Sequence, residues 1–255
     1  MKKLLPFCLI LLALAVPLSG QGTTEKVTES KTAVVASTSW TAAFADLGGL
    51  DDVQHIAPAN LIHPPEYEIT VSDVIQINHA DYFIYAGYER MMQSMGDSIK
   101  KDSDSMIQIN TNNSVENVKA QALKIAQIMG TEEKSAPRVA RYEEAVKAGA
   151  LRAKELGLTE QKVYCHSMQV YLAKDLGLSV AGTFGPGPLS AAQIAEVAKG
   201  GYGLIIDNIH NPIASPLLEV SKESRLVVWR NFPESGNKNS LQTMVQANID
   251  ALLDI

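Results

Sequence analysis

Length, composition and charge already narrow the class of protein. The chain has 255 residues and a formal net charge of −6. This length is enough to bury a large core, in one large domain or two small ones. The mildly acidic balance argues against nucleic-acid binding, which requires basic patches. Cys8 lies in the apolar N-terminal stretch, so Cys165 is the one cysteine expected in the mature chain, and it cannot form an internal disulfide.

The N-terminus has the pattern of a secretory signal. A short cationic start precedes an apolar stretch that runs to Leu18, which is too short for a membrane span. We expect residues 1–20 to be a signal peptide and the polar residues 21–31 to be a disordered leader. Gln21 stands where a lipoprotein would carry its lipidated Cys. We therefore expect a periplasmic or extracellular protein without a stable membrane span, with an uncleaved N-terminal anchor as the alternative.

Short apolar runs of strand length alternate with helix-like stretches along the rest of the chain. Helical periodicity and stop signals such as Gly130 separate these runs. The expected strands are 33–37, 53–57, 82–86, 105–110, 162–165, 179–183, 203–207 and 226–229. The expected helices are 40–47, 70–78, 89–99, 114–129, 137–156, 167–176, 190–199, 212–222 and 241–253.

The helix expected at 137–156 divides this alternation into two halves. It is rich in Ala, Arg, Glu and Lys, and Gly149 is its one weak point. Strand–helix alternation on both sides predicts an α/β protein with two lobes, each with a mostly parallel, Rossmann-like sheet. We assign residues 32–135 to an N-terminal lobe, 136–157 to one long linking helix and 158–255 to a C-terminal lobe.

Two histidines about a hundred residues apart each lie at or just beyond the end of a strand-like run. His63 opens the segment His-Pro-Pro-Glu-Tyr-Glu, and His166 ends the segment Val-Tyr-Cys-His. Parallel sheets bind ligands beyond the carboxyl ends of their strands. Strand-end histidines from two halves of a chain can therefore meet in a cleft and share a metal ion. The plainer interpretation is that His63 caps the following helical region and that His166 only precedes a helix.

The order of these motifs resembles the zinc/manganese branch of the substrate-binding proteins of ABC transporters, over nearly the whole mature chain. The segment 63–73 resembles the first histidine loop of that family, 166–178 its second histidine motif, and 244–252 its last helix. The resemblance implies two globular lobes, a rigid linking helix and a metal held between the lobes. It also implies that a monomeric protein delivers zinc or manganese to an ABC permease.

Two of the four ligand positions that the resemblance implies lack a usual ligand. Asn110 lies nearest to the second histidine of the family, and Asn231 lies nearest to its last ligand, with Arg230 beside it. Asn oxygens are weak and uncharged donors for zinc or manganese. Replacement donors follow a predicted strand of the second lobe, where Asp207 offers a carboxylate and His210 an imidazole.

These replacement donors have plainer interpretations too. His210 precedes Asn211-Pro212, which is a turn pattern, and Asp207 is suited to cap a helix or to bind the backbone. Glu66 and Glu68 in the first histidine loop are further candidate donors. The predicted metal ligands are His63, His166, His210 and Asp207.

Other function classes fit the sequence less well. Cys165 and His166 are adjacent, so on a strand they point to opposite faces and cannot form a catalytic pair. The chain has no Gly-x-Ser-x-Gly elbow and no His-Glu-x-x-His helix, and we expect no enzyme. One rival is a binding protein of the same fold that has lost the metal and holds another solute through Arg230, Asn110 and Asn231. A second rival is a surface adhesin with a vestigial cleft.

Overall fold

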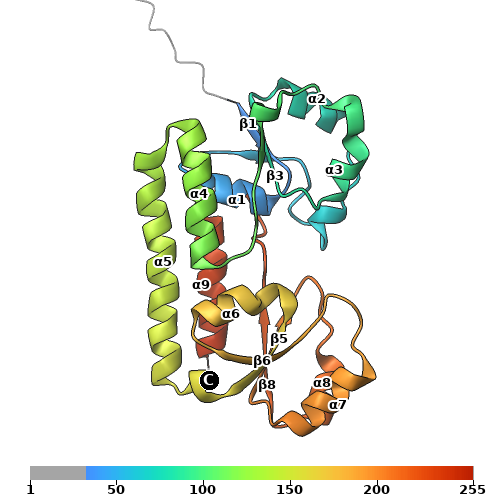
Figure 1. Ribbon diagram of the computed structural model, residues 1–255, viewed down its shortest axis with the longest axis vertical. Coiled ribbons are helices and arrows are strands. Elements are labelled where there is room, and N and C mark those ends of the chain that lie inside the picture. Colours follow the sequence, from blue (N-terminus) through green and yellow to red (C-terminus); the bar gives the residue numbers. More distant parts are fainter. Residues whose placement is uncertain (1–32, 255) are drawn as a thin grey trace, which may run out of the picture. The chain divides into compact units, whose positions relative to one another are not determined.

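The computed structural model describes residues 33–254, which belong to one compact unit, Thr32–Ile255 (Figure 1). The predicted signal peptide and leader lie outside the described residues. Within residues 33–254, no helix combines the length and the apolar character that a membrane span requires.

The N-terminal lobe is built on a four-stranded parallel sheet with the order β2-β1-β3-β4. Helices α2 and α3 share an apolar cluster with one face of this sheet, which includes Val35, Ile77, Phe83 and Met91. Its strands are β1 (Val34–Ala36), β2 (Gln54–His55), β3 (Tyr82–Tyr85) and β4 (Met106–Gln108). Its helices are α1 (Ser39–Leu47), α2 (Val71–His79), α3 (Arg90–Met95) and α4 (Val115–Met129).

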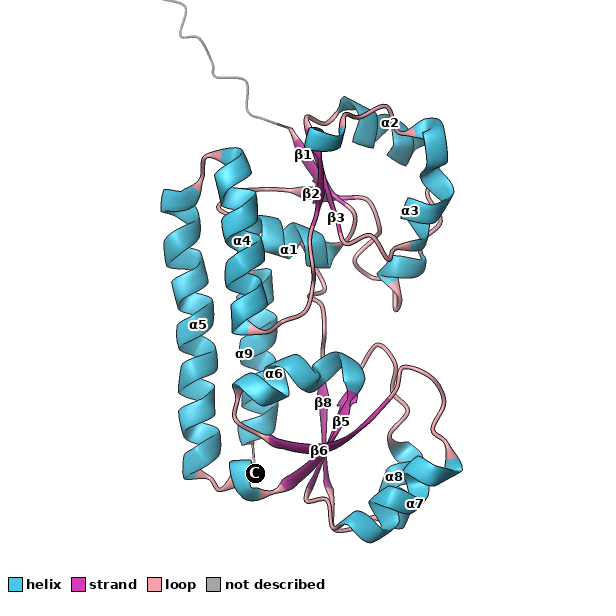
Figure 2. Ribbon diagram, viewed as in Figure 1, coloured by secondary structure: helices cyan, strands magenta, loops and turns pink. Residues whose placement is uncertain are grey.

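The C-terminal lobe repeats this topology with the order β6-β5-β7-β8, and every strand pair is again parallel. Helices cover both faces of the sheet, with α6 and α9 on one side and α7 and α8 on the other (Figure 2). Its strands are β5 (Lys162–His166), β6 (Ser179–Phe184), β7 (Leu204–Asn208) and β8 (Arg225–Trp229). Its helices are α6 (Val170–Asp175), α7 (Ala191–Gly200), α8 (Ser215–Val220) and α9 (Ser240–Leu253).

In both sheets the first strand along the chain lies between the second and the third. The direction in which strands are added therefore reverses between β1 and β3, and between β5 and β7. Ligands of open parallel sheets bind in the crevice at such reversals, beyond the carboxyl ends of the strands. The predicted α/β fold with two mostly parallel sheets is thus confirmed, and it fixes where a ligand site is to be sought.

The long helix α5 (Glu132–Glu155) starts five residues earlier than the sequence predicts and contains Pro137. A proline this close to a helix start removes only the bond to the carbonyl four residues before it. Ser135 donates to the carbonyl of Leu47, at 2.7 Å, which ties the first turns of α5 to α1. This contact offsets the backbone hydrogen bond that Pro137 cannot make, so the helix continues through the proline.

Helix α3 ends earlier than expected. The sequence pattern predicts a helix at 89–99, but α3 stops at Met95, where a short 3-10 turn, Gly96–Ser98, takes over. Gly96 has a φ of +46°, a conformation that ends a helix and that glycine adopts without a side-chain penalty.

A continuous apolar core joins the two lobes. One buried cluster contains Phe44 and Ile84 from the N-terminal lobe, Val146 from α5, and Val163 and Trp229 from the C-terminal lobe. Helix α5 packs along both α4 and α9. Because close-packed interiors resist deformation, this shared layer limits how far one lobe can tilt against the other.

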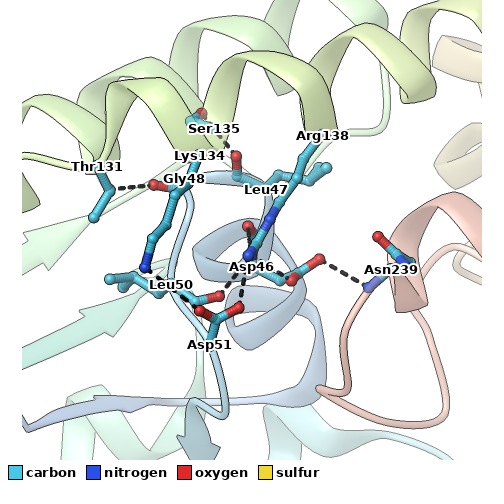
Figure 3. Close-up of polar contacts among 10 residues, drawn as sticks. All are labelled: Asp46, Leu47, Gly48, Leu50, Asp51, Thr131, Lys134, Ser135, Arg138 and Asn239. Carbon is cyan, nitrogen blue, oxygen red and sulfur yellow. Dashed lines mark hydrogen bonds and ion pairs between the residues drawn. The ribbon is translucent and has the colours of Figure 1, made fainter.

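A buried polar cluster fixes α5 to α1 (Figure 3). The guanidinium of Arg138 pairs with Asp46 at 2.7 Å and with Asp51 at 2.6 Å, and it also donates to two carbonyls near the end of α1. Thr131 donates to the carbonyl of Gly48, and the amide of Asn239, just before α9, donates to Asp46. We call this set the Arg138 junction. It satisfies carbonyls that the end of α1 leaves without helical partners.

Candidate metal and solute site

A cavity of about 450 Å³ lies where the two lobes face each other. It is lined by strand ends and loops of both sheets, by Trp40 of α1 and by Tyr171 of α6. Among the described residues in its wall, Glu66 is the one carboxylate, and there is no lysine or arginine. The wall also contains three histidines and four asparagines: His63, His166, His210, Asn112, Asn208, Asn211 and Asn231.

Three of the four predicted ligands line this cavity. His63 comes from the N-terminal lobe, and His166 and His210 come from the C-terminal lobe. Asp207 is not part of the wall. The residue is 3% exposed, and its carboxylate accepts hydrogen bonds from the amides of Asn208, at 2.8 Å, and Ala214, at 2.9 Å. Asp207 thus closes the turn after β7, as the backbone-binding interpretation of this residue expects.

His166 is the last residue of β5 and is fully buried. Its Nδ1 accepts a hydrogen bond from the amide of Met168, at 3.2 Å, so its proton lies on Nε2 and is donated to Oδ1 of Asn211, at 3.1 Å. Burial lowers the pKa of His166, and the contacts with Asn211 and Asp207 only partly oppose this. The ring is therefore neutral at neutral pH. Ligation of a metal through Nε2 would break the hydrogen bond to Asn211 and move the proton to Nδ1, which could then no longer accept from Met168.

His210 is held differently. Its ring stacks on Phe232 with centroids 3.7 Å apart and planes inclined by 20°. Burial and the nearby Arg230 lower the pKa of His210 to about 4, more than the carbonyls of Ile62 and Phe232 raise it. Its Nε2 is buried and has no hydrogen-bond partner among the described residues. His210 is therefore a neutral imidazole whose Nε2 is unpaired and closed off from solvent, so ligation through this nitrogen requires the ring to move.

His63 lies at the exposed edge of the cavity, just before the 3-10 helix Pro64–Glu66. Its side chain makes no capping hydrogen bond to that helix, so the capping interpretation finds no support here. Glu66 lies in the wall beside it, whereas Glu68 pairs with Arg90 at 2.9 Å. Of the two candidate carboxylates in this loop, Glu66 is the one within the cavity.

The histidines share a wall without forming a ready-made site. Within residues 33–254, no group of three or more His, Cys, Asp or Glu side chains is arranged so that it could hold a metal ion. A zinc site needs about four donors at close to 2 Å. Joint ligation by the three rings therefore requires side chains or lobes to move toward each other.

The polar residues considered for another solute have different surroundings. Asn231 lines the cavity, is 6% exposed, and its Oδ1 has no partner among the described residues. Asn110 does not line the cavity. Its Oδ1 accepts a hydrogen bond from the amide of Asn112, which does line the cavity. Arg230 pairs with Glu234 at 2.6 Å and does not line the cavity.

Sequence reasoning missed several wall residues. Tyr88 follows β3, Asn208 and Asn211 lie at the end of β7 and just beyond it, and Phe232 follows β8. The rule that parallel strands present ligand residues at their carboxyl ends could have found them. A search for metal donors passes over neutral amides and aromatic rings.

Solved structures of metal-binding proteins share this architecture, although the sequence matches no protein-family model and no curated protein. The Mn-bound periplasmic metal-binding protein of Candidatus Liberibacter asiaticus superposes with a TM-score of 0.62 and 15% identity, over 88% of this chain and 99% of that one. The laminin-binding protein of Streptococcus agalactiae, an adhesin with metal-transporting activity, gives a TM-score of 0.65 and 18% identity over 86% and 97%.

The metal-dependent lipoprotein of Bacillus subtilis gives a TM-score of 0.63 with 21% identity, over 87% of this chain and 97% of that one. At such identities the likeness speaks for the fold. The resemblance seen in the sequence is thus confirmed at that level: the chain has the two-lobed α/β fold of the periplasmic metal-binding proteins.

Proposed function

We propose that the protein is an extracytoplasmic solute-binding protein that delivers a divalent transition metal, zinc or manganese, to an ABC permease. The observation that carries the proposal is that His63, His166 and His210, from both lobes, line one cavity. Neutral imidazoles are common metal ligands, and two of these rings are kept neutral by burial. Structures with the same fold hold manganese or are named as metal transporters.

The donor set favours zinc. Imidazole nitrogens suit zinc, whereas manganese prefers carboxylate, carbonyl and water oxygens. Glu66 is the one carboxylate among the described residues that line the cavity. We therefore expect zinc to bind more tightly than manganese.

Titration calorimetry with zinc and manganese tests the proposal. His63→Ala and His210→Ala should each weaken zinc binding at least about tenfold, which corresponds to about 1.4 kcal/mol. His55→Ala and His79→Ala are matched controls, because neither residue lines the cavity, and should leave binding unchanged. The absence of specific zinc or manganese binding to the parent protein would refute the metal assignment.

A second candidate is an organic solute without metal. The cavity volume of about 450 Å³ falls in the range of roughly 300–1,000 Å³ that is usual for small-molecule sites. Its wall combines aromatic side chains with neutral amides, which is typical of such sites. This candidate leads if the parent protein binds neither metal.

A further inference from the structure

We propose that Asn113, assisted by Ser39, is a positioning residue of the cavity, which holds wall residues of the two lobes in place relative to each other. The inference rests on the proposed function, because the cavity that Asn113 organises is the proposed metal site. Thr111 and Asn112 line the cavity, but Asn113 does not and is 4% exposed. It therefore acts through the residues that it binds.

Both polar groups of the Asn113 side chain are used. Its Oδ1 accepts a hydrogen bond from Nε1 of Trp40, at 3.0 Å, and its Nδ2 donates to the backbone carbonyl of Asn231, at 2.8 Å. Trp40 belongs to α1 of the N-terminal lobe, and Asn231 follows β8 in the C-terminal lobe. Both residues line the cavity. A single planar amide thus sets the spacing between one wall residue of each lobe.

The bond to the backbone of Asn231 also places the residue that follows. Phe232 lines the cavity, and its ring centroid lies 6.0 Å from that of Trp40. The ring of His210 stacks on the same Phe232, with centroids 3.7 Å apart. The position of this predicted ligand ring is therefore set by a segment whose backbone is bound to Asn113.

A second side chain of the N-terminal lobe binds the same segment. Ser39, the first residue of α1, is fully buried and donates to the carbonyl of Pro233, at 2.8 Å. The segment 231–233 is therefore held on both sides of Phe232 by the N-terminal lobe, although it follows a strand of the C-terminal lobe. This part of the wall should move with the N-terminal lobe.

Removal of the Asn113 amide should weaken metal binding without changing a ligand. In Asn113→Leu, Trp40 and the segment 231–233 lose their common partner, so they must be ordered when the solute binds, which lowers affinity. Loss of a residue that orients metal ligands weakens metal binding about 10- to 100-fold, and we expect zinc to bind at least about tenfold more weakly in calorimetric titrations of the full chain. Ser39→Ala, a milder change at a helix start, should weaken zinc binding by a smaller factor.

Tyr142→Phe is the matched control. Tyr142 of α5 donates to the backbone carbonyl of Asn113, at 2.7 Å, and does not line the cavity. Its substitution removes a buried hydrogen bond at the same residue but leaves both side-chain contacts of Asn113 in place. Urea unfolding should show lower stability for Tyr142→Phe and for Asn113→Leu, whereas zinc affinity should fall only in Asn113→Leu.

NMR spectra of the metal-free chain give a readout that does not depend on zinc. The chain has two tryptophans, Trp40 and Trp229, and hence two indole N–H signals. Asn113→Leu should move the Trp40 signal upfield, because its proton loses its acceptor. Trp229, whose Nε1 has no partner among the described residues, is the internal reference. Tyr142→Phe should leave both signals near their positions in the parent.

The possible outcomes separate the inference from the proposed function. If Asn113→Leu leaves zinc binding unchanged, or weakens it no more than Tyr142→Phe does, the inference is overturned and the proposed function stands. A Trp40 signal that does not move in Asn113→Leu also overturns it. If Asn113→Leu does not fold, unchanged zinc affinity in Ser39→Ala has the same consequence. If the parent binds neither zinc nor manganese, the proposed function falls, and the Trp40 signal alone decides whether Asn113 positions the wall.

Discussion

The Arg138 junction and the cavity wall both contain buried polar groups. These groups are paired at the junction, whereas two of them in the cavity wall are not. At the junction Arg138 donates to two carboxylates and two carbonyls, and Asp46 also accepts from the amide of Asn239. Four buried side-chain atoms among the described residues have no partner. Two of them, in His210 and Asn231, belong to the cavity wall, and the others are in Trp229 and Ser240.

This difference separates a structural cluster from a candidate binding surface. Buried polar groups are nearly always paired in folded proteins, because an unpaired group costs about 1–3 kcal/mol. The junction meets this rule within the chain. At the cavity, Nε2 of His210 and Oδ1 of Asn231 leave this rule unmet among the described residues.

The largest effect that would test this contrast is expected from Arg138→Ala. The change leaves the carboxylate of Asp46, whose side chain is 6% exposed, buried without its cation. Breaking a buried ion pair from one side costs about 3–5 kcal/mol. Urea unfolding should therefore show a loss of that size in the free energy of unfolding.

Arg152→Ala on the same helix is the matched control. Arg152 pairs with Glu155 at 2.8 Å, but both side chains are more than half exposed. Exposed ion pairs contribute about 0–1 kcal/mol. If both variants lost the same small amount of stability, the junction would be no more important to the fold than a surface pair.

An intermediate effect is expected from a comparison of two buried asparagines. Asn248 accepts from the amide of Arg230 and donates to its carbonyl, at 2.9 and 2.8 Å, so Asn248→Ala should cost about 1–3 kcal/mol. Asn231 has an unpaired Oδ1, so Asn231→Leu should leave the free energy of unfolding unchanged or raise it by about 1 kcal/mol. A loss for Asn231→Leu as large as for Asn248→Ala would assign Asn231 a structural role.

Much of the fold could be predicted from the sequence, because hydrophobic periodicity and stop signals are local. The sequence predicted each strand to within a few residues, and the alternation predicted the parallel sheets. The predictions failed where tertiary contacts decide. Proline normally marks a helix boundary, but Pro137 lies inside α5 because Ser135 and Arg138 bind the end of α1.

The site was only partly predictable, for a related reason. Position at or beyond a strand end, together with the family resemblance, led to the prediction of His63, His166 and His210, and all three line one cavity. The sequence could not show that the Asp207 carboxylate would bind backbone amides, or that the two nitrogens of His166 would be engaged by Met168 and Asn211. Such details depend on how a loop turns back on its own strand, which no spacing rule records.

The smallest expected effect concerns acid and separates the two carboxylates of the junction. The hydrogen bond from Arg138 lowers the pKa of Asp51 below its ordinary value of 3.8. Its carboxylate therefore stabilises the fold above pH 3.8, and this contribution is lost as the pH falls through the lowered value. Burial raises the pKa of Asp46 despite its pairing with Arg138, so protonation of Asp46 opposes that loss.

Asp51→Asn should cost only about 0.5–1 kcal/mol at neutral pH, because the side chain of Asp51 is 40% exposed. Urea unfolding at pH 7 and pH 3 should show a smaller loss of stability in acid for Asp51→Asn than for the parent. In an Arg138→Ala background the same substitution should change the acid dependence less, since the donor that contributes most to lowering the pKa of Asp51 is gone. If Asp51→Asn kept the acid sensitivity of the parent in both backgrounds, Asp51 would not be the group through which the junction responds to acid.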